Sequence, residues 1–216
     1  GLHRVRFDDS FGPEISRIGE DAMPRLFTAL EIPHDAALSL SLLRGGLPGA
    51  RWIDAENYHV TLRFIGDVEG HVADEFANAL DRVHRPSFHL ELTGVGQFGG
   101  KKPHSIWAGV RQRAELTQLQ GEIERICQRL RLPADPRKFV PHVTLARLRN
   151  ADVTDVAHYL SSRGNFSTLP FRVGRFVLMS SRDSVGGGPY IVEEAWPLDA
   201  MPVVSNQVSA AARIMP

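Results

Sequence analysis

The chain has a single cysteine, Cys127, among its 216 residues. One thiol excludes an intrachain disulfide and any metal site built from several cysteines. An excess of either charge is also missing, because 25 basic residues balance 25 acidic ones. This balance argues against a broad electrostatic surface for long nucleic acids, although a local cationic pocket for a phosphate remains possible.

Long apolar runs are absent as well. No stretch reaches the roughly 18 consecutive apolar residues expected of a transmembrane helix, and the first residues lack the apolar segment of a secretory signal. The hydrophobic share of 43% is ordinary for a globular protein. We therefore expect a cytoplasmic protein with a core of normal size.

The ends of the chain differ from its middle. Residues 1–22 are polar and show no clear period, so we expect an N-terminal extension there. Met23 then opens a strongly apolar segment, and residues 23–199 are expected to form one domain. Residues 200–216 are expected to be a peripheral C-terminal tail.

Hydrophobic spacing predicts the elements of the middle part. Four segments have the period of an amphipathic helix: residues 35–44, 69–83, 114–130 and 152–162. Seven have the character of strands: residues 25–32, 58–65, 88–95, 105–110, 142–148, 171–179 and 190–196. The order strand, helix, strand, helix, strand occurs twice, which predicts two related halves around a pseudo-two-fold axis and a shared cleft.

A short motif is repeated within these halves. Residues 58–64 read YHVTLRF, and residues 141–148 read PHVTLARL. Side chains of a strand alternate between its two faces, so His59 should lie beside Thr61, and His142 beside Thr144. The intervening valines and leucines would face the core. The repeat therefore predicts one pocket that holds two histidines and two threonines.

Two imidazoles across a cleft can serve as general base and general acid near neutral pH. Displacement at phosphorus needs this pair, with hydroxyl groups and an arginine to bind the non-bridging oxygens. Three other interpretations compete. A histidine in a strand is often merely structural, the repeat could be a coincidence, and two histidines could be part of a zinc site. No metal-binding spacing and no Gly-x-Ser-x-Gly motif support a metal or serine-hydrolase site.

These motifs resemble the 2H phosphoesterase superfamily, in particular its RNA 2′,3′-cyclic phosphodiesterase branch, also called 2′–5′ RNA ligase-like. The resemblance rests on the paired His-x-Thr motifs, their spacing and the opening segment RLFTALEIP of residues 25–33. It covers about residues 23–198. It implies an α+β fold of two lobes, with two antiparallel-rich sheets and flanking helices around a central cleft.

The resemblance also implies roles for individual residues. His59 and His142 would be the catalytic pair, and Thr61 and Thr144 would bind phosphate. Arg147 matches the family's phosphate-contacting arginine.

Two further positions remain open. Strict alternation places Arg147 opposite His142, so it can serve only if the strand bends or bulges near Ala146. Arg63 shares the face of His59 by the same rule and is its rival. Phe27 matches an aromatic position near the nucleobase, and plain core packing is equally compatible with it.

The implied reaction is hydrolysis of an RNA or nucleotide 2′,3′-cyclic phosphate to a 2′-phosphate, without metal or cofactor, with 2′–5′ ligation as its reverse. The expected partners are RNA ends or nucleotides that carry the cyclic phosphate. We expect no membrane association and no obligate protein partner, and we expect the protein to be a monomer. The alternatives are an enzyme for an ADP-ribose cyclic phosphate and a nucleotide- or RNA-binding module without turnover.

Overall fold

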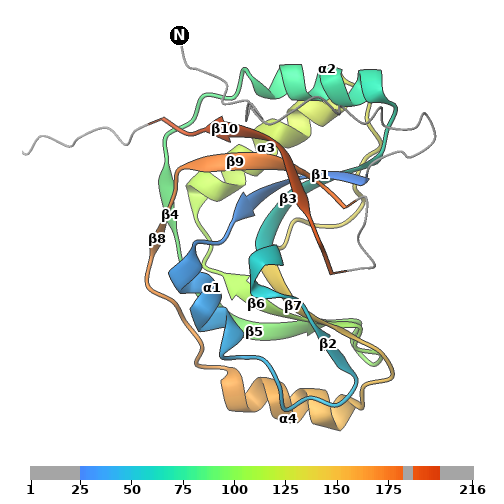
Figure 1. Ribbon diagram of the computed structural model, residues 1–216, viewed down its shortest axis with the longest axis vertical. Coiled ribbons are helices and arrows are strands. Elements are labelled where there is room, and N and C mark those ends of the chain that lie inside the picture. The colour runs from blue at the N-terminus through green and yellow to red at the C-terminus, as the bar shows by residue number, and fades with distance from the viewer. Residues whose placement is uncertain (1–24, 182–186, 200–216) are drawn as a thin grey trace, which may run out of the picture.

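Two antiparallel groups of strands form the two lobes of the molecule (Figure 1). The computed structural model describes residues 25–181 and 187–199. The expected extension of residues 1–22 and tail of residues 200–216 lie outside the described residues. Among the described residues, no helix is long and apolar enough to cross a membrane.

One lobe, in the upper half of Figure 1, carries four strands in the order β10-β9-β1-β3. These are β1 (Arg25–Glu31), β3 (His59–Asp67), β9 (Arg175–Ser180) and β10 (Ile191–Pro197). Two helices accompany this lobe, α2 (Gly70–Leu80) and α3 (Ala114–Arg129). Helix α3 packs on β3 and α2, because one of its faces is apolar. That face comprises Leu116, Leu119, Ile123, Ile126 and Cys127, all of them buried.

The other lobe carries the remaining strands of the same sheet. They are β2 (Ala50–Trp52), β5 (Leu92–Phe98), β6 (Ser105–Val110) and β7 (His142–Leu148), with β7 between β6 and β2. Helix α4 (Val153–Arg163) contacts β5, and its first turn is capped by the Asp152 carboxylate, which accepts from the backbone of Thr154 and Asp155. Helix α1 (His34–Ser41) contacts the short 3₁₀ helix η1 (Ala55–Asn57).

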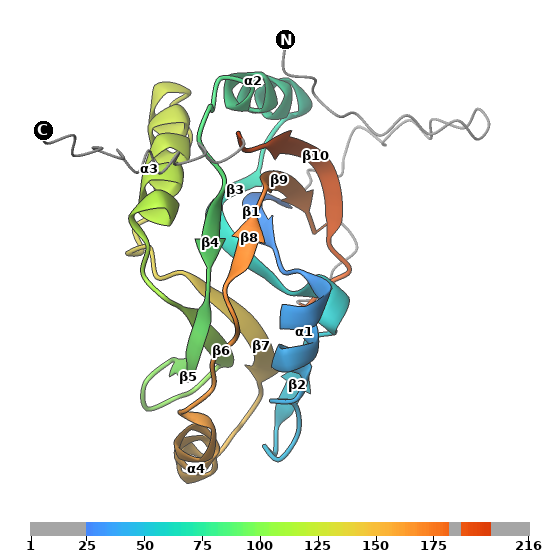
Figure 2. The ribbon, with the colours of Figure 1, turned by 90° about the vertical axis from the view of Figure 1, so that its left-hand side faces the viewer.

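A second, two-stranded sheet runs along the side of the molecule. Strands β4 (Phe88–Leu90) and β8 (Phe171–Val173) pair there, where Figure 2 shows them side by side between the lobes. Residue Glu91 separates β4 from β5, and Gly174 separates β8 from β9. At each of these two positions, a single residue separates a strand of the small sheet from a strand of the large sheet.

The two lobes meet where β3 pairs with β7, and the one registered pair is Val60 with Val143. These two valines occupy the same place in the two copies of the HVTL motif. An antiparallel pair has a local two-fold axis, so pairing of equivalent residues makes that axis relate the two motifs. The predicted pseudo-two-fold arrangement is therefore centred one residue away from each histidine.

Both motif strands contain a bulge at the same place. Between β1 and β3, Thr28 pairs with Arg63 and Ala29 with Thr61, so Leu62 is the extra residue. Between β6 and β7, Ile106 pairs with Ala146 and Trp107 with Thr144, so Leu145 is extra. An extra residue inverts the alternation beyond it. The fifth residue after each histidine therefore returns to the face of that histidine.

The α+β fold with two antiparallel halves, expected from the resemblance, is confirmed. All four helices form within a few residues of their predicted bounds. The strands expected at residues 88–95 and 171–179 were wrong as single elements, because each divides between the two sheets. Strand β2 and helix η1 were not predicted, since elements of three residues have no measurable period.

Candidate active site

His59 and His142 are the first residues of β3 and β7, and their side chains enter the same cleft. The cleft has a volume of about 580 Å³. Thr61 and Thr144, two residues further along each strand, also line it. The pocket with two histidines and two threonines, expected from the alternation of each strand, is present in the structure.

The two imidazoles are held in the same way. His59 Nδ1 lies 2.8 Å from the carbonyl oxygen of Asn57, and His142 Nδ1 lies 2.7 Å from that of Val140. A carbonyl oxygen can only accept, so each Nδ1 carries the hydrogen and donates it. In the neutral ring, Nε2 then has a free lone pair. Both histidines thus present the same nitrogen for proton transfer within the cleft.

The surroundings lower the pKa of both histidines. Burial is the largest cause for His59, and the nearby His142 and Arg147 add to it against the bond to Asn57, so that its pKa falls from 6.5 to about 4. Burial also lowers the pKa of His142, together with Arg147 and Arg137 and against the bond to Val140. His59 is therefore the more firmly neutral of the two.

Arg147 lies in this cleft because of the β7 bulge. The bulge at Leu145 buries Ala146 completely and leaves Arg147 exposed at the cleft wall. Arg147 lines the cleft together with both histidines, and its positive charge contributes to lowering the pKa of each. The condition that β7 bulges near Ala146 is thus met.

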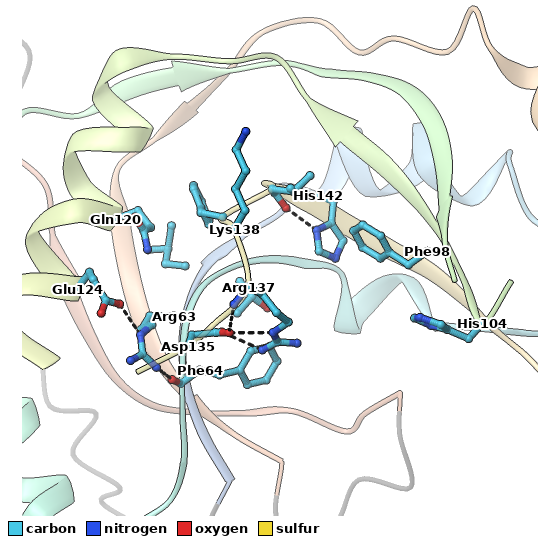
Figure 3. Close-up of a pocket in the computed structure, with 14 residues that line it drawn as sticks. Arg63, Phe64, Phe98, His104, Gln120, Glu124, Asp135, Arg137, Lys138 and His142 are labelled. Atoms are coloured by element: carbon cyan, nitrogen blue, oxygen red, sulfur yellow. Dashed lines mark hydrogen bonds and ion pairs between the residues drawn. The ribbon is translucent and has the colours of Figure 1, made fainter. Parts of the chain in front are cut away.

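The expectation that Arg63 shares the face of His59 is wrong. The bulge at Leu62 turns Arg63 to the other side, where its side chain is only 5% exposed. Its guanidinium donates to Glu124 of α3 and to the carbonyl oxygen of Phe64 (Figure 3). It also donates to the carbonyl oxygen of Pro133. This arginine fastens α3 and the chain after it to β3.

Phe27 lies beside His59, but its ring is buried in the wall of the cleft. Its ring is 2% exposed and its centroid lies 5.0 Å from that of His59. A ring so covered has no open face for a nucleobase. Of the two interpretations of Phe27, the structure favours core packing. Phe64, the fifth residue after His59, is the exposed aromatic side chain of this wall, at 43%.

An aromatic ring meets each histidine edge-on. Tyr190 lies 4.9 Å from His59 and Phe98 lies 4.9 Å from His142, both nearly perpendicular. Trp107 packs on Phe98 beside His142. These rings restrict the orientation of the imidazoles.

Four cleft residues had no signal in the sequence. Phe98 ends β5 and Tyr190 immediately precedes β10, both far from the motifs in the sequence, and Arg137 and His104 lie in connecting segments. His104 in particular resembles the other scattered histidines when only the sequence is read. Its place is set by the turn from β5 to β6, where its backbone N–H donates to the Phe98 carbonyl.

Cation ligands are not gathered anywhere in the described part of the chain. Within residues 25–181 and 187–199, no three His, Cys, Asp or Glu side chains are arranged to hold a metal ion. The lining of the cleft contains three histidines, three arginines and one aspartate, a set suited to an anion.

Comparison with known proteins assigns the family. Residues 42–184, well over half of the chain, match the 2′-5′ RNA ligase superfamily. The chain belongs to this superfamily. Both histidines and both threonines lie within the matched residues.

Relatives of this superfamily member are named RNA 2′,3′-cyclic phosphodiesterase. The protein of Thermotoga maritima is 31% identical over 78% of this chain and 92% of its own length. That of Aeropyrum pernix is 38% identical over 54% of this chain, and that of Geobacillus stearothermophilus is 34% identical over 70%. The matches span 66% and 50% of these two relatives' own lengths.

The superfamily fold is also found among solved structures. The crystal structure of Escherichia coli LigT complexed with 3′-AMP has a TM-score of 0.65 and 27% identity, and it covers 81% of this chain and 98% of that protein. The fold of this superfamily member therefore has an experimental counterpart.

Proposed function

We propose that this protein hydrolyses 2′,3′-cyclic phosphates at RNA ends or on nucleotides to 2′-phosphates, without a metal ion. The observation that carries the proposal is the pair of identically held imidazoles on β3 and β7 in one cleft. Binding alone would need hydroxyls and arginines, but it would not need two matched proton carriers.

The reaction is an in-line displacement at phosphorus. One histidine takes a proton from water as the water oxygen attacks the phosphorus atom. The bond between phosphorus and O3′ breaks, and the second histidine gives its proton to O3′. The products are a free 3′-hydroxyl and a 2′-phosphate, and the two imidazoles have exchanged protonation states.

The environments of the two rings favour one division of labour. His59, with a pKa of about 4, is the base because it is neutral over the physiological range. His142, whose pKa is lowered less strongly, is the acid. Arg147 and the hydroxyls of Thr61 and Thr144 bind the non-bridging oxygens, where negative charge develops in the transition state.

The same residues would catalyse 2′–5′ joining. A 5′-hydroxyl in place of water would attack the cyclic phosphate and form a 2′–5′ linkage as the bond to O3′ breaks, with the histidines in the same roles. Water far exceeds any RNA 5′-end in concentration, so hydrolysis dominates in dilute solution. The names of the relatives, which are RNA 2′,3′-cyclic phosphodiesterases, support the hydrolytic direction.

Turnover of a 2′,3′-cyclic nucleotide by the purified protein with excess chelator tests the proposal. We expect a 2′-nucleotide as product, and a loss of about 100-fold or more in kcat for His59→Ala and for His142→Ala, with unchanged circular dichroism. Full activity of both variants, or loss of wild-type activity on chelation, would contradict it.

Two alternatives have their own outcomes. Tight binding of the 2′-nucleotide with no turnover would indicate a binding module. Faster turnover of an ADP-ribose cyclic phosphate than of any RNA end or nucleotide would indicate a different substrate.

A further inference from the structure

A second chamber of about 710 Å³ opens beside the catalytic cleft. It lies between β3, α3 and the segment that leads into β7 (Figure 3). Six residues line both cavities: Thr61, Phe64, Phe98, His104, Arg137 and His142. The catalytic cleft and the chamber are therefore one continuous groove, and His142 stands where they join.

The carboxylates of the chamber are already neutralised. Asp135 is bound by Arg137 through contacts of 2.9 and 2.8 Å, and Glu124 is bound by the buried Arg63. These pairs leave one lining cation, Lys138, with no acidic partner among residues 25–181 and 187–199. Its side chain is exposed, so its ammonium group can receive an anion that follows the groove.

Apolar surface is uncovered in the same place. Phe64 is 43% exposed and Val140 is 44% exposed, and both line the chamber. Gln120 of α3 adds a side-chain amide that has no hydrogen-bond partner among the described residues. The Arg137 guanidinium lies over the Phe64 ring, 5.5 Å from its centroid, so the exposed remainder of the ring and Val140 offer apolar contact. Exposed apolar surface, an amide and a nearby ammonium group can contact a nucleobase and its phosphodiester.

We infer that this chamber binds the nucleotide that precedes the cyclic phosphate in an RNA chain. The inference rests on the proposed function and names its substrate class. A terminal 2′,3′-cyclic phosphate occupies both ribose oxygens, so the chain can continue only through the 5′-oxygen. The groove beyond His142 then receives the penultimate nucleotide, with its base against Phe64 and Val140 and the linking phosphodiester at Lys138.

The substrate class that follows is an oligoribonucleotide end. A free mononucleotide fills only the catalytic cleft and leaves the chamber empty. An ADP-ribose cyclic phosphate supplies no phosphodiester with this polarity. The protein should therefore prefer a dinucleotide with a terminal cyclic phosphate to the matching mononucleotide.

Measurement of kcat/KM for a matched pair of substrates tests this inference. The pair consists of a nucleoside 2′,3′-cyclic phosphate and the same unit extended by one 5′-linked nucleotide. We expect the wild-type protein to prefer the dinucleotide by at least about tenfold, since a charge-assisted contact is added. Lys138→Ala should lower this preference about tenfold. Added salt should lower the wild-type preference and have little effect on that of the variant.

Lys101→Ala is the matched control, because it removes the same charge from an exposed lysine that lines neither cavity. It should keep the wild-type preference. Equal kcat/KM for both substrates in the wild-type protein would overturn the chamber assignment and leave the proposed function standing. An unchanged preference in Lys138→Ala would also overturn it. Absence of turnover with either substrate would instead refute the proposed function.

Discussion

The two histidines differ less in geometry than in their surroundings. Each donates from Nδ1 to a carbonyl two residues earlier in the chain, so the backbone itself selects the tautomer. No carboxylate is needed to select the tautomer, and the motifs contain none. The depth of burial then distinguishes a more firmly neutral His59 from His142.

The dependence of activity on pH should follow these pKa values. The acid must carry a proton and the base must not. As the pH increases, kcat/KM should therefore rise around the pKa of His59, about 4, and fall around the pKa of His142, which lies below 6.5. A profile of kcat/KM for a cyclic mononucleotide from pH 3.5 to 9 measures this. A maximum above about pH 8 would contradict it.

Stability should depend on pH through the same group. His59 has a pKa of about 4 in the folded protein and near 6.5 when unfolded, so the unfolded chain binds the extra proton between these values. The contribution of the neutral His59 to the free energy of unfolding is fully present above pH 6.5 and is lost as the pH falls toward 4. In urea titrations, His59→Gln should lose about 2 kcal/mol less than wild type over that interval. Equal losses would contradict the prediction.

At the scale of elements, the paired bulges decide which arginine serves the cleft. By simple alternation Arg63 faces the cleft and Arg147 does not, and the structure reverses both. Because the bulges occupy equivalent places, they belong to the repeat itself. Position five after each histidine carries Phe64 in one lobe and Arg147 in the other, so the two equivalent positions give the cleft one aromatic and one cationic side chain.

Substitution of the two arginines separates these roles. Arg147→Ala should lower kcat/KM about 100-fold and change the unfolding free energy by less than about 0.5 kcal/mol, because its side chain is exposed. Arg63→Ala should cost about 2–4 kcal/mol of stability, since Glu124 loses its partner and two carbonyls lose a donor. Urea titration and steady-state kinetics measure both. The reverse pattern would refute the bulge-based assignment.

Gly96 packs against Trp107, which lies beside His142. A Cβ on Gly96 would lie 2.3 Å from the Trp107 ring, so the indole covers that backbone closely. Gly96→Ala should displace the ring and cost about 1–3 kcal/mol. Gly70→Ala, at the start of α2 with nothing within 4 Å, is the control and should be neutral or stabilising. Equal thermal unfolding midpoints for the two variants would contradict this.

The elements that could be predicted from the sequence are the long ones with a regular hydrophobic pattern. Helix α3 and strands β1, β6 and β7 show their apolar faces in the sequence, and the HVTL repeat indicated the pocket. The bulges were less visible. In β7 the consecutive apolar residues Leu145 and Ala146 hint at one, but in β3 the second of these positions is the charged Arg63. Burial of Arg63 depends on Glu124, which no local pattern connects to it.

The two lobes are joined by few backbone contacts between β3 and β7, but one hydrophobic cluster extends through both. Val60 and Val143 form the registered pair between β3 and β7, and one hydrophobic cluster contains both valines, Leu30 of one lobe and Ile106 of the other. The distance between His59 and His142 is therefore set by packing to which both lobes contribute. We expect the lobes to unfold together, as a single cooperative unit.

Tryptophan fluorescence reports each lobe separately. Trp196 lies in β10, while Trp52 and Trp107 lie in the other lobe. A Trp196→Phe variant and a Trp52→Phe, Trp107→Phe double variant, each corrected for its own stability by circular dichroism, should show fluorescence midpoints that coincide with the dichroism midpoints. Midpoints that differ between the two probes would show that the lobes unfold independently.

The central claim is that the two histidines divide proton transfer at one phosphate. Its most direct test is kcat/KM for a cyclic substrate in which sulfur replaces O3′, because a thiolate leaves without protonation. His142→Ala should recover most of its lost activity relative to wild type on this substrate, whereas His59→Ala should remain about 100-fold impaired. Equal impairment of both variants on the sulfur substrate would contradict the assignment of His142 as the acid and His59 as the base.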